Sequence, residues 1–147
     1  DGFHRSNEAL EAMGLLELKG VPASFDAESF VTHHERLRRP DPVSRPTYDR
    51  IKEDTVTGGR LIDSETQVFV VEGNYLLLDT GPWDRIRHLL DEVWYLDVPE
   101  EALTRRLVAR HELARSAEDA RAKVESTDRP NARLVARTRL RADVVIA

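Results

Sequence analysis

The sequence contains no cysteine, and this absence excludes several kinds of chemistry at once. Without thiols, the 147-residue chain has no disulfide framework, no thiolate zinc site and no cysteine nucleophile. It also lacks any apolar run near the roughly 20 residues of a membrane span, and no signal-peptide pattern opens it. These absences favour a soluble protein of a reducing compartment such as the cytoplasm, with no membrane partner.

Acidic residues outnumber basic ones by 27 to 22, and the net charge is −5. This balance disfavours a general nucleic-acid binder, because such binding depends on neutralising phosphates. The charge is uneven, since residues 1–98 carry a net charge of −8 and residues 99–147 a net charge of +3. Residues 129–141 contain five arginines and no acidic residue from one arginine to the next, at positions 129, 133, 137, 139 and 141. Such a run more usually forms a solvated helix face, and a nucleic-acid surface is the alternative.

Three short runs of continuous apolar residues predict strands that are buried on both faces, at residues 68–72, 93–97 and 143–147. Apolar residues at helical spacing over 83–90, and again after Pro99, predict helices between these strands. Further helices are expected where Asp26 and Ser116 can act as N-caps. This alternation predicts an α/β fold with a doubly wound parallel sheet.

Residues 40–63 do not fit the alternation, because prolines at 40, 42 and 46 disfavour a helix there. We expect a flap in this segment, with a short hairpin over residues 48–57 that ends at a turn at Gly58-Gly59. The sheet is also short of strands, since a central strand at 68–72 needs hydrogen-bonded neighbours on both sides. Because the chain begins at Asp1 rather than methionine, we expect a single domain over 1–147 that is incomplete at its N-terminus.

Acidic side chains follow two of the predicted strands, and a third begins the chain. Glu72 and Asp97 end their strands, and Asp1 would do so if a strand preceded it. Ligands of open α/β sheets bind at these carboxyl ends, where a carboxylate can hold Mg²⁺ or accept a proton from a hydroxyl. We favour this functional interpretation for Glu72. For Asp97, which directly precedes Val98-Pro99, we favour an ordinary role in capping the next helix or in a solvated turn.

Several short motifs, taken together, resemble one known family. They are Asp1-Gly-Phe-His4, Lys19-Gly-Val-Pro22, Phe25-Asp26, Tyr48-Asp49-Arg50, Val70-Val-Glu-Gly-Asn-Tyr75, Gly81-Pro-Trp83, Arg106-Leu-Val-Ala-Arg-His111 and Pro130-Asn-Ala-Arg133. In this order and spacing, they resemble the P-loop kinases grouped with uridine kinase, phosphoribulokinase and bacterial pantothenate kinase. The resemblance extends over essentially the whole chain and implies a P-loop NTPase fold of the nucleoside kinase-like type.

One motif of that family is absent from the chain. A P-loop requires Gly-x-x-x-x-Gly-Lys-Ser/Thr, whose backbone amides and lysine hold the phosphates of ATP. No lysine directly follows any of the seven glycines in this sequence. In the family this motif precedes the Asp-Gly-Phe segment, so we expect it upstream of Asp1, and we expect the chain alone to bind ATP weakly.

The resemblance also implies roles for individual side chains in catalysis and ATP binding. Asp1 would be the general base that takes the proton of the acceptor hydroxyl. Glu72 would act with it, as the acidic residue that helps to hold Mg²⁺. Arginines of a lid over about 105–130 would contact the phosphates of ATP: Arg106, Arg110 and, more weakly, Arg115. An ordinary alternative for these arginines is a solvated helix face with local pairs to Glu101 and Glu112.

Three further residues would line the acceptor pocket according to the same resemblance: His4, Tyr48 and Arg50. Packing within the hairpin is the alternative for Tyr48, and a plain turn position is the alternative for His4. The leading hypothesis is an ATP-dependent kinase that uses Mg²⁺ and phosphorylates a hydroxyl of a nucleoside, sugar or pantothenate-like molecule. The alternative is a non-catalytic, kinase-like interaction or regulatory domain without a P-loop, and a second copy of the chain stays open as a partner.

Overall fold

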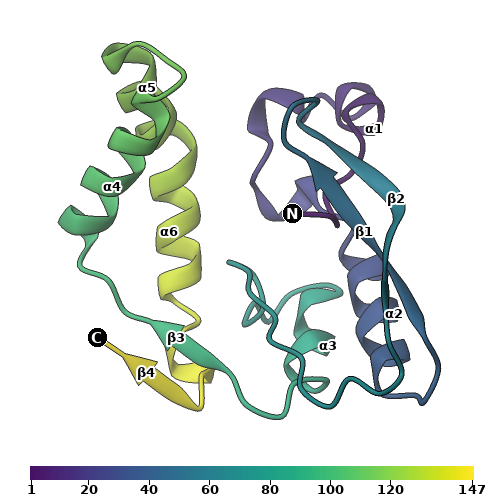
Figure 1. The fold of residues 1–147 in the computed structure, drawn as a ribbon. Coiled ribbons are helices and arrows are strands. Elements are labelled where there is room, and N and C mark those ends of the chain that lie inside the picture. The colour runs from purple at the N-terminus through teal and green to yellow at the C-terminus, as the bar shows by residue number, and fades with distance from the viewer. The chain divides into compact units, whose positions relative to one another are not determined.

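The computed structural model describes residues 1–147, whose contacts divide into two compact units, Asp1–Leu89 and Leu90–Ala147 (Figure 1). None of the helices combines the length and apolar character needed to cross a lipid bilayer. The single kinase-like domain over 1–147 and the lid over 105–130 stay predictions.

The first unit is built from short helices and one antiparallel hairpin. Its helices are α1 (Asn7–Ala12), α2 (Ala27–Leu37) and α3 (Trp83–Arg87), its strands are β1 (Val43–Asp49) and β2 (Asp54–Ile62), and 3-10 turns lie at Leu16–Leu18 and Pro22–Ser24. Asp26 caps α2 as predicted, because its Oδ1 accepts a hydrogen bond from the backbone N–H of Ser29 at 3.1 Å. The same residue ties the N-terminal segment to α2, since its own N–H donates to the carbonyl oxygen of Phe3 at 2.8 Å.

Aromatic rings form the centre of this unit. Trp83 packs against three other rings at centroid distances of 5.7–6.0 Å, namely those of Tyr75, Phe30 and Phe25. The same unit has fully buried aliphatic side chains, including Leu10, Val31 and Ile86. Because rings from the loop before α2, from α2 itself and from α3 meet here, this core holds the N-terminal half of the unit in place.

The hairpin forms and turns within the predicted range 48–57, but its second strand continues through Gly58-Gly59. Asp49 pairs with Asp54 across the end of the ladder, so the turn comprises residues 50–53. The side chain of Asp49 stabilises this turn, because its Oδ1 accepts hydrogen bonds from the backbone N–H groups of Ile51 (2.9 Å) and Lys52 (3.1 Å). The prediction that the chain turns at Gly58-Gly59 is therefore wrong.

Gly58-Gly59 serve a different purpose within β2. The strand register shifts between Arg45 and Thr47, on either side of Pro46, which has no N–H to offer the ladder. Gly58 adopts a φ of +64° there, and a Cβ on Gly59 would lie 2.2 Å from Oγ1 of Thr47. The two glycines thus accommodate an irregularity in the hairpin rather than its turn.

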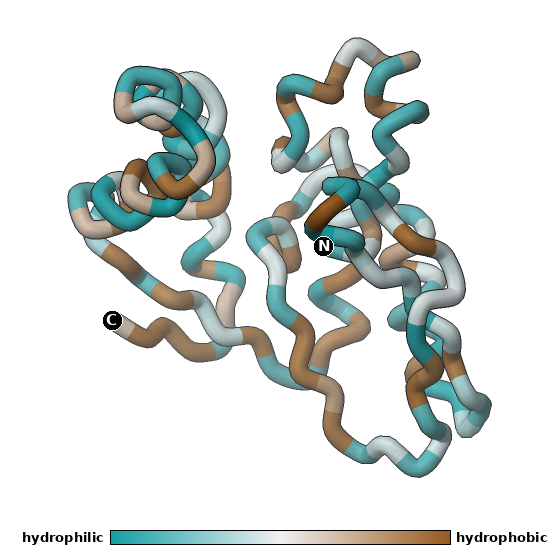
Figure 2. Tube along the Cα trace, turned by 45° about the horizontal axis from the view of Figure 1, so that its top comes forward, coloured by the Kyte–Doolittle hydropathy of each residue, from teal (hydrophilic) through white to brown (hydrophobic).

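The second unit combines one parallel strand pair with a helical region. β3 (Trp94–Leu96) and β4 (Val144–Ile146) pair in parallel, and between them come α4 (Glu100–Glu112), α5 (Ala117–Lys123), a π-helical turn (Val124–Asp128), α6 (Arg129–Ala136) and a 3-10 turn (Arg139–Arg141). Strands form within the predicted ranges 93–97 and 143–147, and β4 is a continuously hydrophobic stretch in Figure 2. The prediction that they are buried on both faces is wrong, because Trp94, Leu96 and all three residues of β4 are exposed. Ser116 caps α5 as predicted, since its Oγ accepts a hydrogen bond from the N–H of Asp119 at 3.1 Å.

The strand predicted at 68–72 is not formed. No strand pairs with these residues, and the side chain of Val70 is 93% exposed. A buried strand needs ladder partners for its N–H and C=O groups, and this segment has none in the chain. The fold is α/β, as predicted, with its parallel pairing confined to β3 and β4.

Candidate functional site

Asp1 and Arg50, the predicted base and a predicted acceptor-pocket residue, lie in direct contact. Nη2 of Arg50 donates a hydrogen bond to Oδ2 of Asp1 at 2.9 Å, and both side chains are open to solvent. The other carboxylate oxygen of Asp1 has no hydrogen-bond partner in the chain. That oxygen is free to accept a proton from the hydroxyl of a ligand.

His4 joins this pair to the hairpin. Its Nδ1 donates a hydrogen bond to the carbonyl oxygen of Asp1 at 2.8 Å. Its ring lies 4.0 Å from the ring of Phe25 and 5.4 Å from the ring of Tyr48, measured between centroids. The structure therefore brings Asp1 together with all three residues for which the sequence predicts an acceptor-binding role.

His4 is neutral at physiological pH. Burial of its ring, and secondarily the positive charge of Lys19, lowers the pKa of His4 from 6.5 to about 4. Because Nδ1 holds the proton that bonds to Asp1, Nε2 carries a lone pair. A neutral imidazole in this state accepts a hydrogen bond from a hydroxyl group without adding charge to the site.

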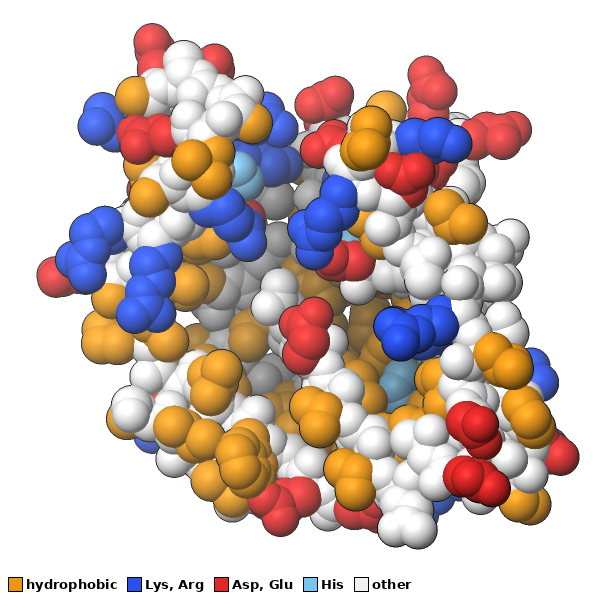
Figure 3. Space-filling view, in the orientation of Figure 1, with side chains coloured by type: hydrophobic (Ala, Val, Ile, Leu, Met, Phe, Trp, Pro, Cys, Tyr) orange, Lys and Arg blue, Asp and Glu red, His pale blue; other side chains and the backbone are white.

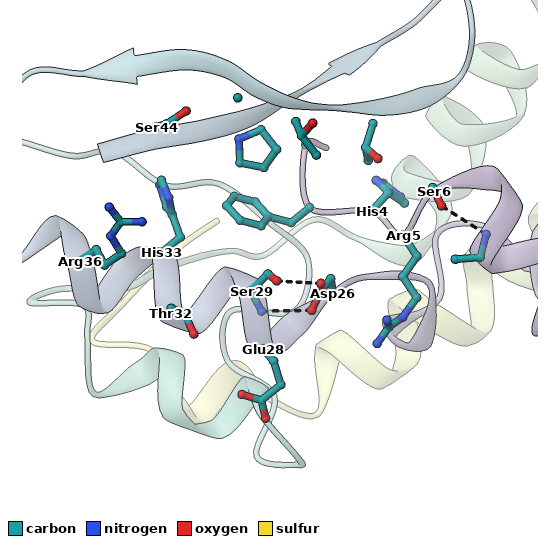
Figure 4. Close-up of a pocket in the computed structure, with 17 residues that line it drawn as sticks. His4, Arg5, Ser6, Asp26, Glu28, Ser29, Thr32, His33, Arg36 and Ser44 are labelled. Carbon is teal, nitrogen blue, oxygen red and sulfur yellow. Dashed lines mark hydrogen bonds between the residues drawn. The ribbon is translucent and has the colours of Figure 1, made fainter. Parts of the chain in front are cut away.

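A groove of about 650 Å³ extends between α2 and the hairpin and includes His4 in its lining (Figure 4). Polar side chains mark its two ends, with His4, Arg5 and Ser6 at one and His33, Arg36 and Ser44 at the other. A volume in this range suits a small metabolite. The hydroxyl, imidazole and guanidinium groups of the lining suit a ligand that carries several hydroxyl groups.

The backbone beside Asp1 is packed too closely to shift freely. A Cβ on Gly2 would lie only 2.4 Å from the carbonyl oxygen of Pro46 in β1. Such a distance is well inside van der Waals contact, so only glycine fits between Asp1 and Phe3 without displacing the strand. The close approach fixes the backbone of Asp1 relative to the hairpin.

Glu72, the predicted Mg²⁺ ligand, lies in the exposed segment that forms no strand. Residues 1–147 contain no group of three or more His, Asp or Glu side chains that could hold a metal ion by themselves. Mg²⁺ is usually held by one or two carboxylates together with substrate phosphates, so a single exposed carboxylate is compatible with this role. The fit therefore depends on phosphates from a bound nucleotide.

The predicted lid arginines carry no ion-pair partner. Arg106 and Arg110 lie on α4 and Arg115 follows it, all three exposed, and none forms the local pairs to Glu101 or Glu112 that were the alternative. Lys and Arg side chains gather on this part of the surface in Figure 3. Unpaired arginines on one helix are available for an anionic ligand.

The arginines nearer the C-terminus are instead engaged by acids. Arg129 pairs with Glu100 (2.9 Å) and Glu125 (2.6 Å), and Arg139 pairs with Asp97 at 2.9 Å. These pairs neutralise part of the arginine run at 129–141 and argue against a continuous nucleic-acid surface there. Asp97 is thus an ion-pair residue, not the helix cap that was one of the two ordinary roles the sequence suggested.

Sequence reasoning left several residues of this region without a role. His33 lines the groove, although its sequence pattern indicated no function. Phe25 and Lys19 lie in motifs of the family resemblance, but nothing in their spacing indicated that they contact His4 and Tyr48. These contacts join residues that are far apart in the sequence, so local patterns do not reveal them.

No protein-family model matches the chain. Over 95% of its length it is 32% identical to the ATP-dependent kinase-like protein notR' of Aspergillus versicolor, and it covers 88% of that protein. It is 29% identical to a pantothenate kinase of Halalkalibacterium halodurans, in an alignment that covers 77% of this chain and 38% of that protein. It also matches the crystal structure of a protein described as a fructose transport system kinase from Silicibacter sp. TM1040, with a TM-score of 0.93 and 35% identity over the whole chain and 72% of that structure.

These similarities define the fold as that of a P-loop kinase. The chain belongs to the kinase family that includes uridine kinase and pantothenate kinase, as the resemblance of its motifs implied. It spans about half the length or less of several curated relatives that it matches.

Proposed function

We propose that the whole protein is a cytoplasmic, ATP-dependent kinase that transfers the γ-phosphoryl group to a hydroxyl of a small molecule. A nucleoside, a sugar and a pantothenate-like compound are the acceptor classes. Membership of the kinase family supports the phosphoryl chemistry. The observation that carries the proposal is the contact of Asp1 with Arg50 and His4 beside a groove of metabolite size.

In this proposal Asp1 is the general base. Its free carboxylate oxygen takes the proton of the acceptor hydroxyl while the hydroxyl oxygen attacks the γ-phosphorus. The bond from that phosphorus to the bridging oxygen breaks, and ADP leaves with the electron pair. Arg50 holds the carboxylate of Asp1 in place, and Nε2 of His4 accepts a hydrogen bond from a second hydroxyl of the acceptor.

Mg²⁺, when bound with ATP, neutralises charge on the β- and γ-phosphates. Glu72 is the residue of this chain proposed to hold it. Arg106, Arg110 and Arg115 are proposed to contact the nucleotide phosphates, which their exposure and lack of ion-pair partners support. Tyr48 is proposed to bind the acceptor next to His4.

The test is an ADP-release assay on the natural full-length protein with a panel of nucleosides, sugars and pantothenate-like alcohols. We expect one acceptor class to stimulate ATP turnover in the presence of Mg²⁺. Absence of stimulation by any class, together with absence of ATP binding in titration calorimetry, would instead support the alternative, a non-catalytic interaction or regulatory domain.

A further inference from the structure

Lys19 lies at the tip of the hairpin and contacts three groups there. Its Nζ donates hydrogen bonds to Oδ1 of Asn7 (2.7 Å) and to the carbonyl oxygen of Glu53. The same Nζ lies 5.1 Å from the centre of the Tyr48 ring, within the range of a cation–π contact. The hydrogen bonds use two of the three N–H donors of the ammonium group, and Lys19 is not among the residues that line the groove.

The turn that Lys19 holds has an unfavourable backbone conformation. Glu53 has a φ of +49° and is the one residue other than glycine with a positive φ in the chain. Residues with a Cβ adopt this region only when surrounding contacts maintain it. The bond from Lys19 to the Glu53 carbonyl is one such contact, and a second tether beside it joins the N–H of Asn7 to Oδ1 of Asp54 at 3.0 Å.

The turn also carries two residues of the candidate site. Tyr48 precedes it and packs against His4, and Arg50 lies within it and reaches Asp1. Because the side chain of Arg50 is highly exposed, its position and direction depend mainly on the backbone conformation of the turn. A change at the tip therefore moves the groups that contact the predicted base and the acceptor.

We propose that Lys19 is a positioning residue that fixes the hairpin tip, so that Tyr48 and Arg50 are held beside Asp1, and that it does not itself contact the acceptor. The expected effect on kinetics rests on the proposed function, whereas the expected effect on the conformation of the tip does not. If the tip loosens without Lys19, only part of the molecules hold a competent site. The acceptor must then reorder the tip on binding, which raises KM and leaves kcat nearly unchanged.

Two variants and one matched control test the structural part on the chain itself. Lys19→Met removes the donors but keeps much of the stem, Lys19→Arg keeps the charge and donors, and Lys52→Met removes the exposed lysine of the same turn, whose side chain makes no contact of this kind. Amide hydrogen exchange of residues 51–55 is expected to speed up by about tenfold in Lys19→Met, less in Lys19→Arg and not in Lys52→Met. Unchanged exchange in Lys19→Met would overturn the proposal.

Asn7→Ala removes the side-chain partner instead of the lysine, and it keeps the test decisive if Lys19→Met folds poorly. It is expected to speed exchange of the same amides while the aromatic near-UV signal of the core is retained. An independent signal comes from His4, because removal of the Lys19 charge raises the pKa of His4 above about 4, as NMR titration of its ring would show. A tip that stays protected in Asn7→Ala would also count against the proposal.

The kinetic part uses the full-length kinase. With Lys19→Met the KM for the acceptor is expected to rise about tenfold with kcat within threefold, and Lys19→Arg is expected to recover part of the loss. A loss of kcat at unchanged KM would show that Lys19 acts in the chemical step and would refute the positioning role. If every form, including the unmodified protein, is inactive while the tip loosens as described, the kinase proposal fails and the positioning of the tip stands.

Discussion

Arg50 reaches Asp1 across 49 positions of sequence, with Nη2 of the guanidinium 2.9 Å from Oδ2 of the carboxylate. The contact joins the turn of the hairpin to the first residue of the chain. Tyr48, at the end of β1, faces His4 at the same place. The predicted base and the predicted acceptor pocket are therefore parts of one constellation, which exists only because the hairpin folds back over the N-terminal segment.

Asp1→Asn should abolish most of the activity of the full-length kinase while leaving acceptor binding intact. The amide keeps the size and hydrogen-bonding capacity of the side chain but cannot take the proton of the hydroxyl. We expect kcat to fall by about 10²–10⁴-fold with a nearly constant KM, measured by steady-state ADP release. The assignment of Asp1 as the base fails if kcat stays within threefold of the unmodified value.

Arg50→Met should lower kcat/KM for the acceptor by about 10–100-fold, because Asp1 loses the partner that orients its carboxylate. The fold should be unaffected, since Arg50 is exposed and makes no contact with the core. Arg60→Met is the matched control, as it removes an exposed arginine from β2 of the same hairpin. Equal effects of the two substitutions would show that only the charge of the hairpin matters.

The stability of the first unit should fall as the pH decreases from 6.5 toward 4. Burial lowers the pKa values of His4 and His33 from 6.5 to about 4, so the unfolded chain takes up protons before the folded one does. Stability is fully present above pH 6.5 and is lost as the pH falls. After allowance for solvent screening, the loss is about 1–2 kcal/mol per histidine.

Urea unfolding at pH 6.5, 5.75 and 5 measures this decline in the free energy of unfolding. These pH values lie above most of the range in which carboxylates titrate, so the histidines dominate the change. His33→Gln should reduce the slope with pH, because it removes one of the histidines whose pKa is lowered by burial, a group that also includes His34. His88→Gln, at an exposed position of the same unit, should leave the slope unchanged. A flat profile in the unmodified chain would contradict the lowered pKa values of His4 and His33.

Gly2→Ala should destabilise the protein and impair the site together. The added Cβ would lie 2.4 Å from the carbonyl oxygen of Pro46. The oxygen is a backbone atom and the position of a Cβ is fixed by the backbone, so no side-chain rotation relieves the clash. We expect a loss of about 1–3 kcal/mol in the free energy of unfolding, together with a weaker contact between Asp1 and Arg50. Gly73→Ala serves as the control, since its Cβ would meet only the side chain of Leu76 at 3.4 Å.

Local patterns were sufficient for much of the secondary structure. Caps at Asp26 and Ser116 depend on short-range hydrogen bonds, which is why the sequence predicted them correctly. The run at 68–72 has the composition of a buried strand, but composition cannot supply the neighbouring strand that a ladder needs. The turn predicted at Gly58-Gly59 is not formed, because these glycines lie within β2 and accommodate the irregularity opposite Pro46, while Asp49 directs the turn of the hairpin through its own side chain.

The sequence by itself determined the class of the protein, because the order and spacing of its motifs belong to the P-loop kinases and this membership is borne out by similarity over nearly the whole chain. It also pointed to Asp1, His4, Tyr48 and Arg50 as separate candidates. Only the tertiary structure decided that these residues meet, that His4 is partly buried and neutral, and that Lys19 contacts the turn between them. The physical reason is that desolvation and contact depend on distances in space, and a linear pattern contains those distances only within a few residues.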